Sequence, residues 1–142
     1  MTDLPFSQDQ LLGQAQGNTT AIILAITAHY QKQGQSLQDL VAYIGGQFAR
    51  DWGQLDAKEA IDNVALNLAS IGATLEQLSG DELDATLIIS DWPSVDALEF
   101  FGLSRGDLDP WGELFRPVAE NLNLQYEWSR DEDRITYRYF KL

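Results

Sequence analysis

The spacing of the apolar residues changes along this chain, and the change falls near Gly72. Before Gly72, apolar residues recur every three or four positions, as they do on one face of a helix. After it, several segments place apolar residues at every second position, which is typical of β-strands. Helices grouped before strands favour an α+β domain, in which helices pack on a mostly antiparallel sheet.

Three helices are expected in the first part, over residues 18–33, from Ser36 onward and from Asp56 onward. Ser36 and Asp56 are capping residues, and Glu59 completes a capping box with Asp56. Gly45 and Gly46 lie within the second helix, where they would let another backbone approach closely. Each helix carries an apolar stripe: Ile22, Ile23, Ile26 and Tyr30; then Leu37, Leu40, Val41, Ile44, Phe48 and Trp52; then Ile61, Val64, Leu68 and Ile71.

Two hairpins are expected in the second part. The segments 73–78 and 83–90 flank the turn SGDE, and LQYEWS and RITYRYF flank a second polar turn. Between the hairpins, Ser94 and Asp109-Pro110 mark two helix starts, and Pro117 is expected to kink or divide the second helix. We interpret residues 1–142 as one α+β domain, with N-terminal helices over about 1–72 and a β-β-α-α-β-β unit over about 73–142.

The charge balance narrows the classes of partner. The 22 acidic and 9 basic residues give a net charge of -13, which repels nucleic acid and anionic membranes. No apolar run approaches the roughly 18 residues of a membrane span, and the first residues, MTDLPFSQDQ, lack the features of a signal peptide. We therefore expect a cytoplasmic protein. Its acidity is explained by solubility, by a salty habitat or by a basic protein partner, and the sequence leaves these open.

The residue types also exclude several kinds of site. The chain has no cysteine, so it can form no disulfide, thiolate nucleophile or cysteine-bound metal centre. With one histidine and no cysteine, the metal ligands that remain are oxygen atoms, which suit calcium or magnesium. The loop from Asp107 to Val118 has the spacing of a calcium loop but lacks an acid at its twelfth position. We expect neither a metal nor a cofactor.

The stretch GLSRG, Gly102 to Gly106, matches the G-x-S-x-G pattern of hydrolase nucleophiles. That pattern needs a strand before it and a histidine after it, whereas the apolar run ALEFF precedes Gly102 and the single histidine, His29, lies far upstream. We predict instead that Gly102 ends a helix and that Ser104 with Asp107 caps a new helical turn.

Aromatic residues form the most distinctive pattern. Trp92, Phe100, Phe101, Trp111 and Phe115 lie close together in sequence, and further tyrosines and Trp128 follow on the predicted strands. Core packing accounts for most of them, but a pocket walled by such residues between sheet and helices suits a small, flat or hydrophobic ligand. His29 and Tyr30 would add polar groups, although a packed histidine is the simpler interpretation. The candidate ligand-binding residues are His29, Tyr30, Trp92, Phe101 and Trp111.

The order of these segments is similar to that of known families. Over about residues 40–140, the chain resembles the C-terminal layout of two families, the 4-vinyl reductase-type ligand domains and the L-2-amino-thiazoline-4-carboxylate hydrolase-like family. The resemblance lies in the order of segments: helices, a strand, the segment SDWPSVDALEFFGLSRGDLDPWGELFRPVAENLNLQYEW and the final strand RITYRYF. Those families commonly carry cysteines where this chain has Trp92, Trp111 and Tyr137, so no thiol or metal role is carried over. The resemblance implies a small-molecule pocket between sheet and helices, and often a dimer.

Three functional hypotheses follow. The first is a cytoplasmic, sensor-like, non-catalytic module that binds a small hydrophobic or aromatic molecule as a homodimer. The second is an acidic adaptor or inhibitor of a basic protein. The third is a small hydrolase that uses His29 or a carboxylate as its base, which predicts an acid beside His29 in a cleft.

Overall fold

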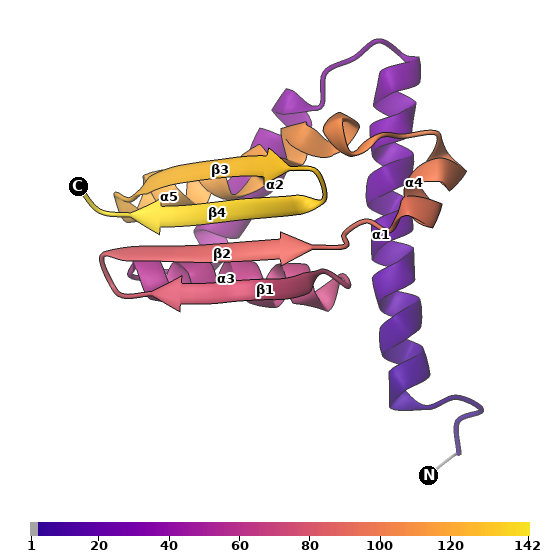
Figure 1. Ribbon diagram of the computed structural model, residues 1–142, viewed down its shortest axis with the longest axis horizontal. Helices are drawn as coiled ribbons and strands as arrows, with labels where there is room; N and C mark the ends of the chain where they lie inside the picture. The colour runs from indigo at the N-terminus through magenta and orange to yellow at the C-terminus, as the bar shows by residue number, and fades with distance from the viewer. Residues whose placement is uncertain (1–2) are drawn as a thin grey trace.

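The computed structural model describes residues 3–142 and has the α+β architecture that the order of segments predicts (Figure 1). A four-stranded antiparallel sheet has the strand order β1-β2-β4-β3. The elements follow in the order α1 (Gln8–Lys32), α2 (Gln38–Asp51), α3 (Ala57–Ser70), β1 (Thr74–Gly80), β2 (Asp84–Ser90), α4 (Val95–Phe101), the 3-10 helix η1 (Arg105–Phe115), α5 (Arg116–Leu122), β3 (Gln125–Asp131) and β4 (Arg134–Phe140).

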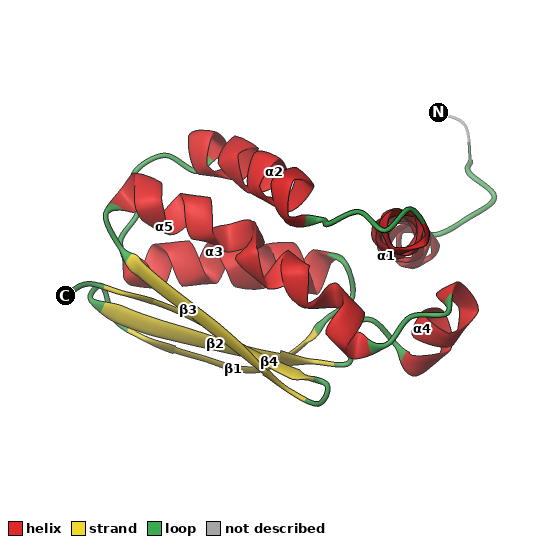
Figure 2. Cartoon of the chain, turned by 90° about the horizontal axis from the view of Figure 1, so that it is seen from above, coloured by secondary structure: helices red, strands yellow, loops and turns green. Residues whose placement is uncertain are grey.

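Both predicted hairpins are present, and their central strands β2 and β4 pair to join them. In the second hairpin Trp128 faces Tyr137 and Tyr126 faces Tyr139, as the alternation of apolar residues predicts. Helices α2, α3 and α5 lie on one side of the sheet (Figure 2). The side chains that point to that side form the main core, in which Leu87, Ile89 and Tyr139 are fully buried.

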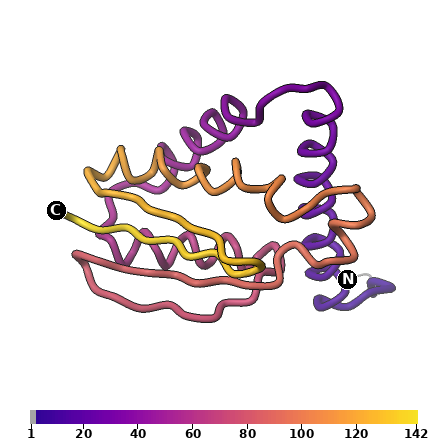
Figure 3. The backbone as a smooth tube through the Cα atoms, turned by 45° about the horizontal axis from the view of Figure 1, so that its top comes forward, coloured from indigo at the N-terminus to yellow at the C-terminus, as the bar shows by residue number. Residues whose placement is uncertain are grey.

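Helix α1 lies beside the end of the sheet and extends beyond it, as Figures 1 and 3 show. It belongs to a second, smaller cluster, in which Leu24 packs with residues of α4 and η1. The other buried members of this cluster are Leu98, Leu103 and Leu108.

The prediction for α1 was wrong in its start and in part of its apolar face, since Ile22 is exposed whereas Ile23, Ile26 and Tyr30 are half-buried. The helix begins at Gln8 because Ser7 and Gln10 form a capping box ten residues before the predicted start. Ile22 is 60% exposed, whereas Leu24 and Thr27 are fully buried. The apolar stripe of α1 is wider than the strip that the neighbouring elements cover, so its most hydrophobic side is not the buried one.

The local signals at the other helix ends are mostly confirmed. Asp56 and Glu59 form the predicted capping box of α3. Ser94 accepts a hydrogen bond from the amide of Ala97 at the start of α4. Ser36 does not cap the amide of Asp39 as expected: its hydroxyl accepts from the amide of Gln38, and Leu37 is the N-cap residue of α2.

Pro117 divides the helical segment before β3, as predicted, but the segment starts earlier than Asp109. Its first part is η1, which begins at Arg105, and its second part is α5, which holds Pro117 in its first turn. Proline is well accepted there because the amides of a first turn have no partner within the helix. None of the helices formed by residues 3–142 combines the length and hydropathy that crossing a membrane requires.

Gly45 marks the closest approach between α2 and the segment η1–α5. A Cβ atom at this position would lie 2.3 Å from the carbonyl oxygen of Leu114, whereas one at Gly46 would meet nothing within 4 Å. The expected role of a glycine in close backbone packing is thus confirmed for Gly45 and wrong for Gly46.

We predict opposite effects of alanine at these two glycines. Gly45→Ala forces a rigid carbonyl away from α2 and should lower the free energy of unfolding by about 1–3 kcal/mol. Gly46→Ala only removes the backbone freedom of an open helical position and should raise it by about 0.5–1 kcal/mol. Urea denaturation of both variants measures this difference. Equal effects would contradict the close packing of α2 against Leu114.

Candidate functional site

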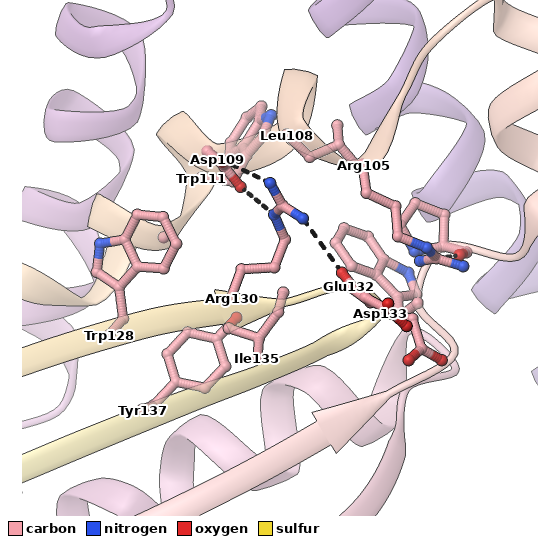
Figure 4. Close-up of a pocket in the computed structure, with 13 residues that line it drawn as sticks. Arg105, Leu108, Asp109, Trp111, Trp128, Arg130, Glu132, Asp133, Ile135 and Tyr137 are labelled. Carbon is pink, nitrogen blue, oxygen red and sulfur yellow. Dashed lines mark hydrogen bonds and ion pairs between the residues drawn. The ribbon is translucent and has the colours of Figure 1, made fainter.

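A cavity lies between η1 and the adjoining ends of β3 and β4 (Figure 4). Its volume is about 30 Å³. Apolar surface dominates its walls, and charged residues surround its mouth. Its lining residues are Trp92, Pro93, Arg105, Leu108, Asp109, Trp111, Gly112, Trp128, Arg130, Glu132, Asp133, Ile135 and Tyr137.

Two of the tryptophans in the cavity wall are held by α1. The indole N–H of Trp92 donates to the hydroxyl of Thr20 at 3.0 Å, and that of Trp111 donates to the hydroxyl of Thr27 at 2.9 Å. Each threonine in turn donates to a backbone carbonyl, that of Ile71 for Thr20 and that of Ile23 for Thr27. The two indoles are therefore oriented by hydrogen bonds that extend from α1 into the rest of the fold.

The third tryptophan, Trp128, comes from β3 and packs on the backbone of η1. A Cβ atom at Gly112 would lie 2.4 Å from its ring, so glycine is required for this contact. The partner of Trp128 across the hairpin is Tyr137, and Figure 4 shows Trp128 to the left of Arg130 and Tyr137 below both. The sheet thus supplies the floor of the cavity, and η1 supplies its opposite wall.

Two arginines lie at the mouth of the cavity. Arg130 forms a two-pronged ion pair with Asp109, with nitrogen–oxygen distances of 2.7 and 3.3 Å, and also donates to the carbonyl of Glu132. The hydrogen bond to Asp109 raises the pKa of Arg130, so its guanidinium stays charged. Arg105 donates to the carbonyl of Pro93 at 2.9 Å, and no carboxylate oxygen of residues 3–142 lies within 4 Å of its guanidinium nitrogens.

Tyr137 differs from the other buried tyrosines. The hydroxyl of Tyr126 donates to the Gly112 carbonyl at 2.5 Å, and that of Tyr139 donates to the Phe115 carbonyl at 2.7 Å. The Tyr137 side chain is 4% exposed, yet its hydroxyl has no hydrogen-bond partner among the described residues and borders the cavity. Burial raises the pKa of Tyr137, so at neutral pH the hydroxyl keeps its proton and can donate it.

A second, shallower cavity of about 350 Å³ lies between α1 and the segment that links β2 to α4. Trp92 and Pro93 separate it from the first cavity, because they line both. Phe101 lines its far side. On α1 it is bordered by the small residues Gly13, Gly17 and Ala21, which leave the space open.

The structure brings together only part of the predicted ligand-binding set. Trp92 and Trp111 share the first cavity, and Phe101 lies in the second with Trp92. His29 and Tyr30 border neither cavity, and their rings contact each other edge to face near the end of α1.

The cavity residues that the sequence prediction leaves out include Trp128, Arg130 and Tyr137. Trp128 and Tyr137 lie on the predicted strands, where core packing accounts for them, whereas Arg130 falls in the predicted turn although β3 extends to Asp131. The usable signal was the pairing of two large aromatic residues near the hairpin turn, where alternation aims them to one side of the sheet.

The hydrolase hypothesis gains no support from the geometry. Ser104 lies at the start of η1 and is exposed, and its amide donates to the carboxylate of Asp107 at 2.8 Å, as the predicted cap requires. Gly102 ends α4 in the left-handed conformation, with φ of 69°. His29 is exposed, and no carboxylate oxygen of residues 3–142 lies within 4 Å of its ring nitrogens.

The part of the chain that the structure describes contains no group of three or more histidine, aspartate and glutamate side chains placed to hold a metal ion. In comparisons with known proteins, no protein-family model and no curated protein matches this chain significantly. The resemblance to the 4-vinyl reductase-type ligand domains therefore stays a prediction.

We predict that the Trp111–Thr27 hydrogen bond contributes measurably to stability. Thr27→Val leaves the indole N–H without its buried partner and should lower the free energy of unfolding by about 1–3 kcal/mol. The double variant that also carries Trp111→Phe should lose about 1 kcal/mol less than the sum of the two single variants, because either substitution alone already removes the hydrogen bond. Urea denaturation of the four proteins of this cycle provides the measurement.

Thr19→Val is the matched control, because Thr19 is exposed on the same helix; its effect should stay within about 0.5 kcal/mol. Strictly additive losses in the cycle would show that the indole and the hydroxyl do not interact.

Proposed function

We propose that this chain is a non-catalytic module that binds a small, flat, aromatic or hydrophobic molecule in the first cavity. The observation that carries the proposal is the Tyr137 hydroxyl, which keeps its proton, has no hydrogen-bond partner among the described residues and opens into a cavity walled by tryptophans. A hydroxyl that opens into a cavity can donate its hydrogen bond to a molecule bound there.

The size of the cavity requires its mouth to open when a ligand enters. The cavity volume of about 30 Å³ holds about one water molecule, whereas ligand pockets measure about 300–1,000 Å³. The groups that would move are the side chains of Arg105 and Arg130. Because ion pairs at a surface contribute only about 0–1 kcal/mol, displacing Arg130 from Asp109 costs little.

The chemistry of the walls defines the class of ligand. The faces of Trp92, Trp111 and Trp128 offer stacking surface, and Tyr137 offers a hydrogen-bond donor to an acceptor atom on the ring or its edge. His29 lies outside the cavity, so the residue type best suited to acid–base work at neutral pH is missing from it, which favours binding over catalysis. A cytoplasmic location is part of this proposal, whereas the adaptor hypothesis stays a prediction that no contact in the structure favours.

The test uses phenol as the probe and the indole N–H signals of the four tryptophans in NMR spectra as reporters. Phenol should shift the signals of Trp92, Trp111 and Trp128 but not that of Trp52, which packs in the main core. Tyr137→Phe should weaken phenol binding by about 3- to 10-fold through loss of one hydrogen bond. The same variant should change the free energy of unfolding by no more than about 0.5 kcal/mol, because the Tyr137 hydroxyl has no hydrogen-bond partner in the protein to lose.

The control is Tyr139→Phe, which removes a hydroxyl that is already paired with the Phe115 carbonyl. It should lower the free energy of unfolding by about 1 kcal/mol and leave phenol binding unchanged. If Tyr137→Phe destabilises the protein in the same way and phenol shifts no tryptophan signal, the cavity is ordinary core and the proposal is wrong.

A further inference from the structure

Helix α1 carries a row of exposed residues at the spacing of a coiled coil. Successive members are separated alternately by four and by three positions, which is the repeat of a helix that packs lengthwise on another helix. Leucine, isoleucine and alanine occupy most of these positions. The row, which we call the outer stripe, consists of Leu11, Ala15, Asn18, Ile22, Ala25 and His29, all of them exposed.

The outer stripe faces away from the rest of the structure. With about 100° of rotation per residue, it lies nearly opposite Thr20, Leu24 and Thr27, through which α1 contacts the rest of the fold. Ile22 at its centre is 60% exposed and Leu11 is 43% exposed. Figure 2 looks along α1 and shows α3 and α4 on one side, with only the segment before α1 on the other.

The charge of α1 is as unusual as its exposure. Between Asp9 and Lys32 the helix has no aspartate, glutamate, lysine or arginine, although 22% of the chain is charged. Two copies with a net charge of -13 each repel one another, and this repulsion opposes association least where a surface lacks acids. A basic partner, by contrast, would bind where acids are dense, and the outer stripe offers none.

We propose that the outer stripe binds the outer stripe of a second copy of this chain, with the two α1 helices antiparallel. This arrangement places the end that carries Asp9 beside the partner's end that carries Lys32, and it opposes the two helix dipoles. A parallel pair would bring like ends together. The proposal does not depend on the proposed ligand.

The register follows from the stripe itself. All six positions of one stripe lie opposite positions of the other when the twofold axis passes near Thr20. The facing pairs are then Leu11 with His29 of the partner subunit, Ala15 with Ala25 of the partner subunit and Asn18 with Ile22 of the partner subunit. The side-chain oxygen of Asn18 already accepts a hydrogen bond from the side-chain amide of Gln14 at 2.8 Å. This hydrogen bond lowers the free-energy cost of burying the Asn18 side chain beside isoleucine. The 25 residues of α1 span about 37 Å, and the outer stripe runs from Leu11 to His29, so the two helices can pack along most of their length.

The first test compares Ile22→Glu with Leu66→Glu by sedimentation equilibrium. Leu66 is 68% exposed on α3 and serves as the matched control. The wild type and Leu66→Glu should both have twice the mass of one chain. Ile22→Glu should raise the dimer dissociation constant at least about 100-fold, because symmetry buries two carboxylates in each dimer. Circular dichroism checks that each variant is folded.

The second test determines the relative orientation of the two α1 helices with single introduced cysteines. The chain has no cysteine of its own, so each introduced cysteine is the only thiol in its chain. Under oxidation, a mixture of Ala15→Cys and Ala25→Cys chains should form mixed disulfide dimers. Ala15→Cys alone should not, because the antiparallel register separates the two copies of this position by about 15 Å along the axis.

Three outcomes would overturn the proposal. They are a monomeric wild type at the highest concentration tested, a dimer that Ile22→Glu leaves intact, and efficient cross-linking of Ala15→Cys alone, which would indicate parallel helices.

Discussion

Two hydrogen bonds from tryptophan to threonine connect the parts of this structure. Thr20 and Thr27 are seven residues apart on α1, so both project to the same side, and they bind Trp92 and Trp111 from two different segments. Helix α1 lies outside the main core, and its place beside the sheet depends on these bonds and on the small cluster around Leu24. The same indoles form the cavity wall, so the elements that hold α1 also shape the candidate site.

The parts of the fold that could be predicted are those with a local cause. The alternation in residues 124–139 fixes which side chains share a face of the hairpin, and the facing of Trp128 and Tyr137 follows from it. Capping residues such as Asp56 and Ser94 act within three positions, so the sequence alone locates the helix starts that depend on them. The division at Pro117 has an equally local origin, because proline lacks an amide hydrogen.

The candidate site was harder to predict because its residues meet through contacts distant in sequence. Trp92 and Trp111 were recognised as site residues, but the position of each depends on a threonine more than 70 residues away. Hydrophobicity also pointed to the wrong side of α1, since the side that contacts the fold includes Thr20 and Thr27 and the side with Ile22 is exposed. A polar residue can lie on a buried face when it finds a hydrogen-bond partner there, and periodicity alone cannot reveal that partner.

The two proposals meet in α1, and this has a thermodynamic consequence. The inner side of the helix holds the tryptophans of the cavity, and its outer side carries the stripe proposed to bind a second copy. Any shift of α1 in the dimer is transmitted to Trp92 and Trp111 through the two threonines. If pairing changes the affinity for a ligand by some factor, the ligand must change the strength of pairing correspondingly, because the coupling free energy between two binding equilibria is reciprocal. If pairing leaves α1 in place, the two proposed equilibria are independent, so their coupling depends on how far pairing moves the indole–threonine contacts.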